Sequence, residues 1–507
     1  GGTVFSGEDS APVVADVWLQ DDRIVGVGAV DGLEADRVVD VTGLAVAPGF
    51  IDLHSHAVRQ SAERSGLYRW PDAENLVRQG VTTVIGGPDG WSPLPLEDSF
   101  RKYAEQGSAV NYGSMVGHGG VRTRVMGLDD RPPTAQELER MRDEVDLAMR
   151  QGAFGLSTGL VYIPGSFSET DEVVALAEVA GQHGGIYISH MRNEALQVLD
   201  SVRELITIAE TAGLPGQITH AKAMGTSMQG RSKDLLALVD EAVARGVDIT
   251  LDQYPYPAGS TGLTVQFPRW SRDGGDSQLA ERLKDPEKRA RIHEALVYEL
   301  TEVRGRNDPA NVQLAYCNFD HSLDGLNLAE LLEKKGREVT IDNAATLIIE
   351  LQEAGGCQAI YHAMHPEDVL NILKHPRTMI AADGGIEVPG NGHPHPRNYG
   401  TYARVLGHYV REQQALPLHT AIHKMTRMPA DRIGLADRGR IEAGAIADIV
   451  AFDPDTVIDR ATFADPHRYA EGVHHVFVAG EAVMLDEKPT GKRPGRILRS
   501  ASYEQVD

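Results

Sequence analysis

The sequence lacks most features that mark secreted, membrane-spanning or nucleic-acid-binding proteins. Only Cys317 and Cys357 are cysteines among 507 residues, and they form no paired motif, which excludes a disulfide framework and suits a reducing cytosol. No apolar run reaches about 18 residues, so we expect no transmembrane helix. There is no long basic run, and 49 Lys and Arg against 73 Asp and Glu give a net charge of −24, which argues against nucleic acid or an anionic membrane as a partner. We expect a cytoplasmic protein and leave its oligomeric state open.

The two ends of the chain lack helical periodicity. Short strand patterns separated by Gly and Asp turns occur at 16–20 and 23–28. Similar patterns return at 447–452 and 475–480. We therefore predict that residues 1–47 and 428–507 pair into one small β-sandwich domain.

Residues 48–427 alternate between strand and helix patterns. Helical segments at 134–151, 169–181, 196–212 and 233–245 separate most of the strands, and such βα repeats imply a parallel sheet. The predicted strands are 50–54, 81–85, 109–116, 153–156, 185–190, 216–220, 247–252 and 378–383. Eight such strands predict an α/β fold, a (β/α)8 TIM barrel. A doubly wound open sheet is the alternative, but no Gly-x-Gly-x-x-Gly follows the first strand.

One stretch, residues 264–350, interrupts the strand–helix rhythm. We interpret it as an insertion between the seventh and eighth strands. A lid over the catalytic face and a purely structural role are equally compatible with the pattern.

Polar residues recur where the predicted strands end, which is the face where barrel enzymes place their chemistry. His54 and His56 are two residues apart on the first strand and point to the same side. His190 ends the fifth strand, His220 the sixth and Asp383 the eighth. Imidazoles suit Zn²⁺, and a carboxylate can complete the site or exchange a proton with water whose pKa the metal lowers to about 7.

Several motifs resemble those of one enzyme superfamily. Segments 48–56 (PGFIDLHSH), 382–385 (ADGG) and 444–450 (GAIADIV) resemble the amidohydrolase superfamily. The branch that the chain is most similar to is the N-acyl-D-amino-acid deacylases, or D-aminoacylases. The segments that indicate this branch are 152–165 (GAFGLSTGLVYIPG), 189–194 (SHMRNE), 220–222 (HAK), 252–256 (DQYPY) and 395–401 (HPRNYGT).

The resemblance implies a distorted barrel with a small β domain, zinc, and hydrolysis of an amide next to a carboxylate. It implies that His190 and His220 hold one tight zinc, that His54 and His56 line a second, weaker position, and that Asp383 is the acid–base residue. The matching positions for a clamp on the substrate carboxylate are Lys222, Tyr254 and Arg397, with Tyr256 and Arg192 as competing candidates.

The chain departs from the branch after the second strand. The branch has a Cys in a Gly-Asn-Cys-Gly setting, whereas this chain has Gly86-Gly87-Pro88-Asp89-Gly90, which places Asp89 at the Cys position. Strand four carries no Lys that could be carbamylated to bridge two metals. Asp89 is therefore a candidate substitute ligand, able to bridge two metals. The alternative is a turn Asp that caps backbone amides.

The expected function is a metal-dependent N-acyl-D-amino-acid deacylase that releases a carboxylate and a free amino acid through a zinc-activated water. The partner is then a small N-acyl amino acid. Two alternatives stay open: an enzyme of the same fold acting on cyclic amides or dipeptides, and a metal-poor binding protein that kept the fold.

Overall fold

The computed structural model describes residues 1–30, 34–58 and 66–504. Its centre is a distorted barrel of parallel strands, in which the third strand is interrupted at Met115. A parallel bridge between Ser55 and Gly384 joins the end of the first strand to the end of the eighth. In chain order the barrel strands are β6 (Phe50–Asp52), β7 (Val81–Gly86), β8 (Asn111–Ser114) with β9 (Val116–Gly117), β10 (Gly155–Gly159), β11 (Ile186–His190), β12 (Gly216–Ile218), β13 (Ile249–Gln253) and β17 (Thr378–Ile380). The predicted eight-stranded barrel is confirmed.

Helices follow most barrel strands and cover their outer faces. The first residues of α5 illustrate the local causes: Thr134 accepts from the Glu137 amide while the Glu137 side chain accepts from the Thr134 amide, a capping box that starts the helix. The helices of the barrel are α1 (Gly66–Arg69), α2 (Glu74–Val77), α3 (Leu96–Gln106), α4 (His118–Met126), α5 (Ala135–Arg150), α6 (Thr170–Gln182), α7 (Val198–Ala212), α8 (Ser232–Ala244), α13 (Pro366–Lys374), α14 (Arg397–Arg404), α15 (Leu418–Met425) and α16 (Arg427–Arg432).

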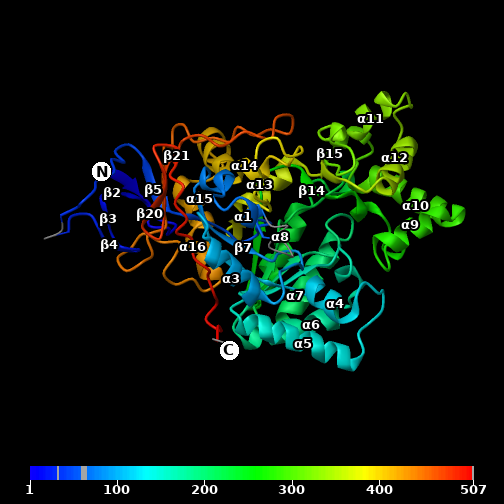
Figure 1. Ribbon diagram of the computed structural model, residues 1–507, viewed down its shortest axis with the longest axis horizontal. Helices are drawn as coiled ribbons and strands as arrows, with labels where there is room; N and C mark the ends of the chain where they lie inside the picture. Colours follow the sequence, from blue (N-terminus) through cyan, green and yellow to red (C-terminus); the bar gives the residue numbers. More distant parts are fainter. Residues whose placement is uncertain (31–33, 59–65, 505–507) are drawn as a thin grey trace.

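Strands from both ends of the chain form one seven-stranded sheet beside the barrel. Its order is β2-β1-β5-β18-β19-β20-β21, and Ala47 of β5 pairs antiparallel with Val450 of β18. The hairpin of β3 (Val17–Gln20) and β4 (Arg23–Val27) packs on this sheet through the buried Ile24. The strands of the sheet are β1 (Gly2–Val4), β2 (Val13–Ala15), β5 (Ala45–Pro48), β18 (Ile449–Phe452), β19 (Val473–Val478), β20 (Glu481–Leu485) and β21 (Lys488–Pro489). Figure 1 shows these blue and red strands together at one end of the molecule.

The segment between β13 and β17 forms a separate unit at the opposite end of the molecule (Figure 1). Three antiparallel strands, in the order β14-β16-β15, pack with helices around their own hydrophobic core. The helix Asp276–Lys284 ends just before Asp285, which caps a new helix that begins at Pro286. Its elements are β14 (Gly259–Gly262), α9 (Asp276–Lys284), α10 (Pro286–Tyr298), β15 (Val312–Tyr316), α11 (Leu328–Lys334), α12 (Ile341–Glu353) and β16 (Gln358–Tyr361).

The two cysteines are joined, which contradicts the expectation that they exclude a disulfide. Cys317 directly follows β15 and Cys357 directly precedes β16, and their Cα atoms lie 4.4 Å apart. The antiparallel register of these strands brings together two residues that are 40 positions apart in the chain. The cysteines therefore give no support to a reducing compartment, which stays a prediction.

Across residues 1–30, 34–58 and 66–504, no helix is both long enough and apolar enough to cross a bilayer.

Candidate metal centre

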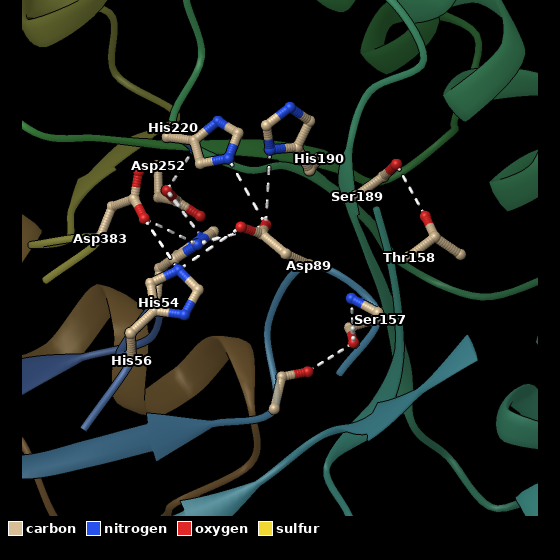
Figure 2. A network of polar contacts seen from close by, with 12 residues as sticks. His54, His56, Asp89, Ser157, Thr158, Ser189, His190, His220, Asp252 and Asp383 are labelled. Atoms are coloured by element: carbon tan, nitrogen blue, oxygen red, sulfur yellow. Dashed lines mark hydrogen bonds and ion pairs between the residues drawn. The ribbon is translucent and has the colours of Figure 1, made fainter. Parts of the chain in front are cut away.

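Six predicted site residues lie together at the carboxyl-terminal mouth of the barrel. His54 and His56 follow β6, His190 is the last residue of β11, and His220 follows β12. Figure 2 shows their imidazoles around the carboxylate of Asp89, with Asp383 beside His54 and His56. The turn after β7 carries Asp89, and the turn after β17 carries Asp383.

The donor atoms form two groups that share Asp89. His54, His56, Asp89 and Asp383 form one group, and Asp89, His190 and His220 form the other, with the donor atoms of each group within 4.8 Å of one another. Asp89 Oδ1 lies 3.4 Å from His54 Nε2, 3.7 Å from His190 Nδ1 and 3.5 Å from His220 Nε2, and Asp89 Oδ2 lies 3.4 Å from His56 Nε2. One carboxylate thus faces both halves of the cluster.

The backbone bends sharply at three of these residues. Asp89, His220 and Asp383 have φ values of 54°, 35° and 49°, in the left-handed region that non-glycine residues seldom adopt. Backbone strain of this kind clusters at functional sites, and here it occurs just after three separate barrel strands.

A buried framework holds the turn that carries Asp89. Ser157 of β10 donates to the Gly87 carbonyl at 2.5 Å and accepts from the Gly90 amide at 3.2 Å. A Cβ on Gly159 would lie 2.3 Å from the Asp89 carbonyl oxygen, so the strand must have glycine there for the turn to approach.

Asp252, at the end of β13, orients the opposite side of the cluster. Its Oδ1 accepts from the His220 amide at 2.6 Å, and its Oδ2 accepts from Gln217 Nε2 at 2.6 Å. Its Oδ1 also lies 3.8 Å from His54 Nδ1. These contacts are those of a carboxylate that positions His220 and His54 from outside the candidate ligand set.

The donor set fits a transition metal such as Zn²⁺. His54 Nε2, Asp89 Oδ1, His190 Nδ1 and His220 Nε2 are buried and have no hydrogen-bond partner. Buried polar atoms are nearly always hydrogen-bonded. Four buried nitrogen and oxygen atoms that face one another without a hydrogen bond therefore indicate a cation between them. Imidazole and carboxylate are ligands that Zn²⁺ accepts.

The electrostatics of the cluster stabilise positive charge. Burial alone would raise the pKa of Asp89, but the His54, His190 and His220 imidazoles hold that pKa well below its ordinary value. Burial and Lys222 act to lower the pKa of His220, yet Glu194 and Asp383 raise it to about 10. The surrounding carboxylates therefore favour positive charge here, whether as protons or as a bound cation.

The three predicted carboxylate-clamp residues lie on one side of this cluster. The Arg397 guanidinium lies 4.7 Å from the Tyr254 ring centroid, and its Nη1 is 2.8 Å from Asp383 Oδ2. Lys222 Nζ lies 5.7 Å from the same ring and 2.6 Å from His220 Nδ1. The competing candidates are engaged elsewhere: Arg192 pairs with Glu204 at 2.8 Å, and Tyr256 donates to Asp459 at 3.5 Å.

One residue of the site, Glu194, was missed by the sequence analysis. Its Oε1 accepts from Lys222 Nζ at 2.6 Å and lies 3.0 Å from His220 Nδ1, while its Oε2 lies 3.4 Å from His190 Nε2. Glu194 thereby links both histidines to Lys222. The available signal was an acidic residue four positions after His190 in the same segment.

Comparison with known proteins also indicates the amidohydrolase family. The amidohydrolase family matches residues 37–308 and 320–484. A D-aminoacylase from Alcaligenes xylosoxydans xylosoxydans is 37% identical over 98% of this chain and 96% of its own. A crystal structure of D-aminoacylase has a TM-score of 0.83 at 35% identity, covering 98% of each chain.

The crystal structure of a second similar protein contains zinc. The N-acyl-D-glutamate deacylase of Bordetella bronchiseptica, in complex with zinc and a phosphonate inhibitor, has a TM-score of 0.82 at 32% identity, covering 99% of this chain and 98% of that one. These matches extend over nearly the whole length of the protein, and they agree with its fold and its clustered histidines. The chain belongs to the amidohydrolase family.

Proposed function

We propose that this protein is a zinc-dependent N-acyl-D-amino-acid deacylase, which hydrolyses the amide of an N-acylated D-amino acid to a carboxylate and the free amino acid. The observation that carries the proposal is the convergence of four histidines on Asp89, next to a cluster of cationic and phenolic groups suited to a substrate carboxylate. Similarity to D-aminoacylase over nearly the full length supports the substrate class.

Asp89 would take part in both metal positions. His190, His220 and Asp89 would hold the tighter zinc, and His54, His56 and Asp89 would line a second position. When bound, zinc supplies Lewis acidity, which polarises a carbonyl oxygen and makes water a nucleophile at neutral pH. The Asp89 carboxylate is a harder ligand than a thiolate but would remain compatible with zinc.

Asp383 would move the proton during hydrolysis. Burial would raise its pKa, but Arg397 together with His54 and His220 lowers it below the ordinary value, so the carboxylate is ionised at neutral pH. Its Oδ1 lies 3.1 Å from His56 Nε2, at the metal cluster, and its Oδ2 faces Arg397. The carboxylate can accept a proton from the attacking water and pass it to the amide nitrogen as the C–N bond breaks.

The substrate carboxylate would lie between Lys222, Tyr254 and Arg397. Arginine offers two parallel donors to a carboxylate, while lysine supplies a compact charge. Anchoring this end of the substrate fixes the position of the neighbouring amide relative to Asp383. A fixed position of this kind favours one configuration at the α-carbon.

Hydrolysis assays on the zinc-loaded protein test the proposal. We expect release of free amino acid from N-acetyl-D-amino acids, with the L enantiomers at least about tenfold slower, a difference of 1.4 kcal/mol in the barrier. A dihydropyrimidine and a dipeptide serve as competing substrates. Turnover of either of these without turnover of any N-acetyl-D-amino acid would refute the proposal.

A further inference from the structure

A cavity of about 300 Å³ opens next to the metal cluster, between the barrel mouth and the inserted unit. Barrel residues on its wall include Glu194 and Met224, and the inserted unit contributes Gln266, Phe267 and the ends of α10 and of the π-helical turn η6 (Glu299–Val303). Glu194 is the carboxylate that accepts from Lys222. The cavity therefore adjoins the proposed clamp on the substrate carboxylate.

Arginine is the commonest charged residue on the cavity wall, and three of its four arginines are neutralised. Arg192 pairs with Glu204 at 2.8 Å, Arg269 with Asp130 at 2.5 Å and Arg304 with Glu299 at 2.6 Å. The fourth, Arg272, has no carboxylate within 4 Å in the part of the chain that the structure describes.

Arg272 is a buried cation with almost no polar partners. It is 8% exposed, and its Nε has no hydrogen-bond partner. Its Nη1 and Nη2 reach only the Val161 carbonyl, at 3.5 and 3.4 Å. Burial, with Arg304 and Arg269 nearby, lowers the pKa of Arg272 to about 10, so the group stays charged at neutral pH. An unpaired buried charge is costly, and here it lies on the wall of a cavity large enough for a side chain.

The two carboxylates on the wall do not neutralise Arg272. Glu299 is engaged by Arg304, and Glu194 is engaged by Lys222 and by two of the four clustered histidines, His190 and His220. The cavity therefore keeps an excess of positive charge. Because the α-carbon of an amino acid bears both the carboxylate and the side chain, a cavity beside the carboxylate clamp is the place for the substrate side chain.

We propose that this cavity binds an acidic side chain, so that the preferred substrates are N-acyl derivatives of D-glutamate or D-aspartate, with the Arg272 guanidinium as the counterion. This inference rests on the proposed function. Arg272 acts as a specificity-determining residue and takes no part in the chemical step.

The test compares kcat/KM for three substrates: N-acetyl-D-glutamate, its uncharged isostere N-acetyl-D-glutamine, and N-acetyl-D-leucine. We expect the wild-type protein to favour glutamate over glutamine by about 30-fold or more, the effect of pairing a buried charge. Arg272→Gln and Arg272→Met should abolish this ratio while kcat/KM for the leucine substrate changes by less than about threefold, which also shows that the variants fold.

Two further variants control for charge. Arg272→Lys keeps the cation and should retain a preference for glutamate over glutamine. Arg291→Gln removes the same charge from α10, where the guanidinium lies 4.5 Å from the Trp270 ring, and should leave the ratio at its wild-type value. A ratio that falls equally in Arg291→Gln would overturn the role of Arg272.

Other outcomes separate this inference from the proposed function. Hydrolysis of N-acetyl-D-leucine with no preference for glutamate over glutamine would overturn the acidic side-chain pocket and leave the deacylase standing. An Arg272-dependent preference for N-succinyl-D-alanine over N-acetyl-D-alanine, without one for glutamate, would place the second carboxylate on the acyl group and overturn the side-chain assignment. Hydrolysis of no N-acyl-D-amino acid would overturn both proposals.

Discussion

At the scale of single residues, the proposed metal site depends most on Asp89. It is the one donor common to both ligand groups, and it lies within 3.7 Å of all four histidines. The alternative of a turn aspartate that caps amides does not explain why Oδ1 is buried without a hydrogen-bond partner. A role as shared ligand explains it.

Substitution of Asp89 should therefore weaken metal binding. Loss of an outer partner of a metal ligand costs about 10–100-fold in affinity, and loss of the shared ligand in Asp89→Asn should cost at least that much. Asp89→Cys should retain zinc, because thiolate is a good zinc ligand. Zinc per chain after dialysis against a graded chelator gives the readout, with the exposed Asp200→Asn as control. Equal zinc retention in wild type and Asp89→Asn would remove Asp89 from the ligand set.

Asp383 should affect turnover and not the tight metal. Asp383→Asn keeps the shape of the side chain but cannot take up the proton, and we expect kcat to fall by about 10²–10⁴-fold. Zinc content should stay at the wild-type value, since His190, His220 and Asp89 are intact. Normal kcat in a zinc-loaded variant would contradict the acid–base role.

The sequence predicted which candidate ligands lie together better than it predicted their surroundings. His54, His190 and His220 each follow a short apolar run, so their convergence could be foreseen from the barrel pattern alone. For Glu194 the sequence offered only its position four residues after His190, and for Arg272 it offered nothing, because their environments depend on how the loop after β11 and the inserted unit pack against each other. No local period in the sequence encodes that contact.

At the scale of elements, a buried lysine from α15 contacts the start of β17. Lys424 Nζ donates to the Thr378 carbonyl at 2.8 Å and also to the His375 carbonyl. Burial lowers the pKa of Lys424 to about 8 from an ordinary 10.5. Two carbonyls compensate only part of the cost of burying an ammonium group.

This lysine predicts an unusual dependence of stability on pH. Between about pH 8 and 10.5 the unfolded chain holds a proton that the folded chain has released, so the contribution of Lys424 to stability rises with pH across this window. Below pH 8 both states are protonated and the penalty, about 3 kcal/mol at most, is fully present. The Tm of wild type relative to Lys424→Met should therefore rise between pH 8 and 10, with the exposed Lys233→Met as control. A Tm difference that is constant with pH would contradict this account.

The disulfide between β15 and β16 could not be predicted from the sequence. Cys317 and Cys357 belong to no motif, and only the register of β15 and β16 brings them together. Closure of a loop of this length stabilises the fold by about 3–4 kcal/mol in the chain-entropy description. The double variant Cys317→Ser/Cys357→Ser should lower the Tm, and a reducing agent should lower the wild-type Tm without affecting the variant. Two reactive thiols in the unreduced, denatured wild type would contradict the pairing.

At the scale of the whole molecule, the proposed metal site would join distant parts of the barrel. The candidate ligands come from the ends of β6, β7, β11 and β12, with Asp383 after β17. A metal that binds only the folded chain stabilises it, by about 2.7 kcal/mol when free metal is at 100 times its Kd. Removal of zinc by a chelator should lower the Tm, and added zinc should restore it. The shift should be smaller in Asp89→Asn, and an identical shift would show that the metal binds elsewhere.

The architecture at this scale was largely readable from the sequence. Regular βα alternation predicted the barrel, and matching strand patterns at both ends of the chain predicted the shared terminal sheet. The inserted unit was recognised as an interruption, but its three-stranded sheet was not, because β14 and β16 are four-residue strands whose partners lie far along the chain.

The most direct test of the account is to locate the metal by anomalous diffraction at the zinc edge, on crystals of the zinc-loaded protein. We predict a peak at coordination distance, about 2.0–2.2 Å, from Asp89, His190 and His220. At higher zinc concentration a second peak should appear beside His54 and His56. A fully loaded protein whose anomalous peaks all lie more than 4 Å from the Asp89 carboxylate would contradict the account.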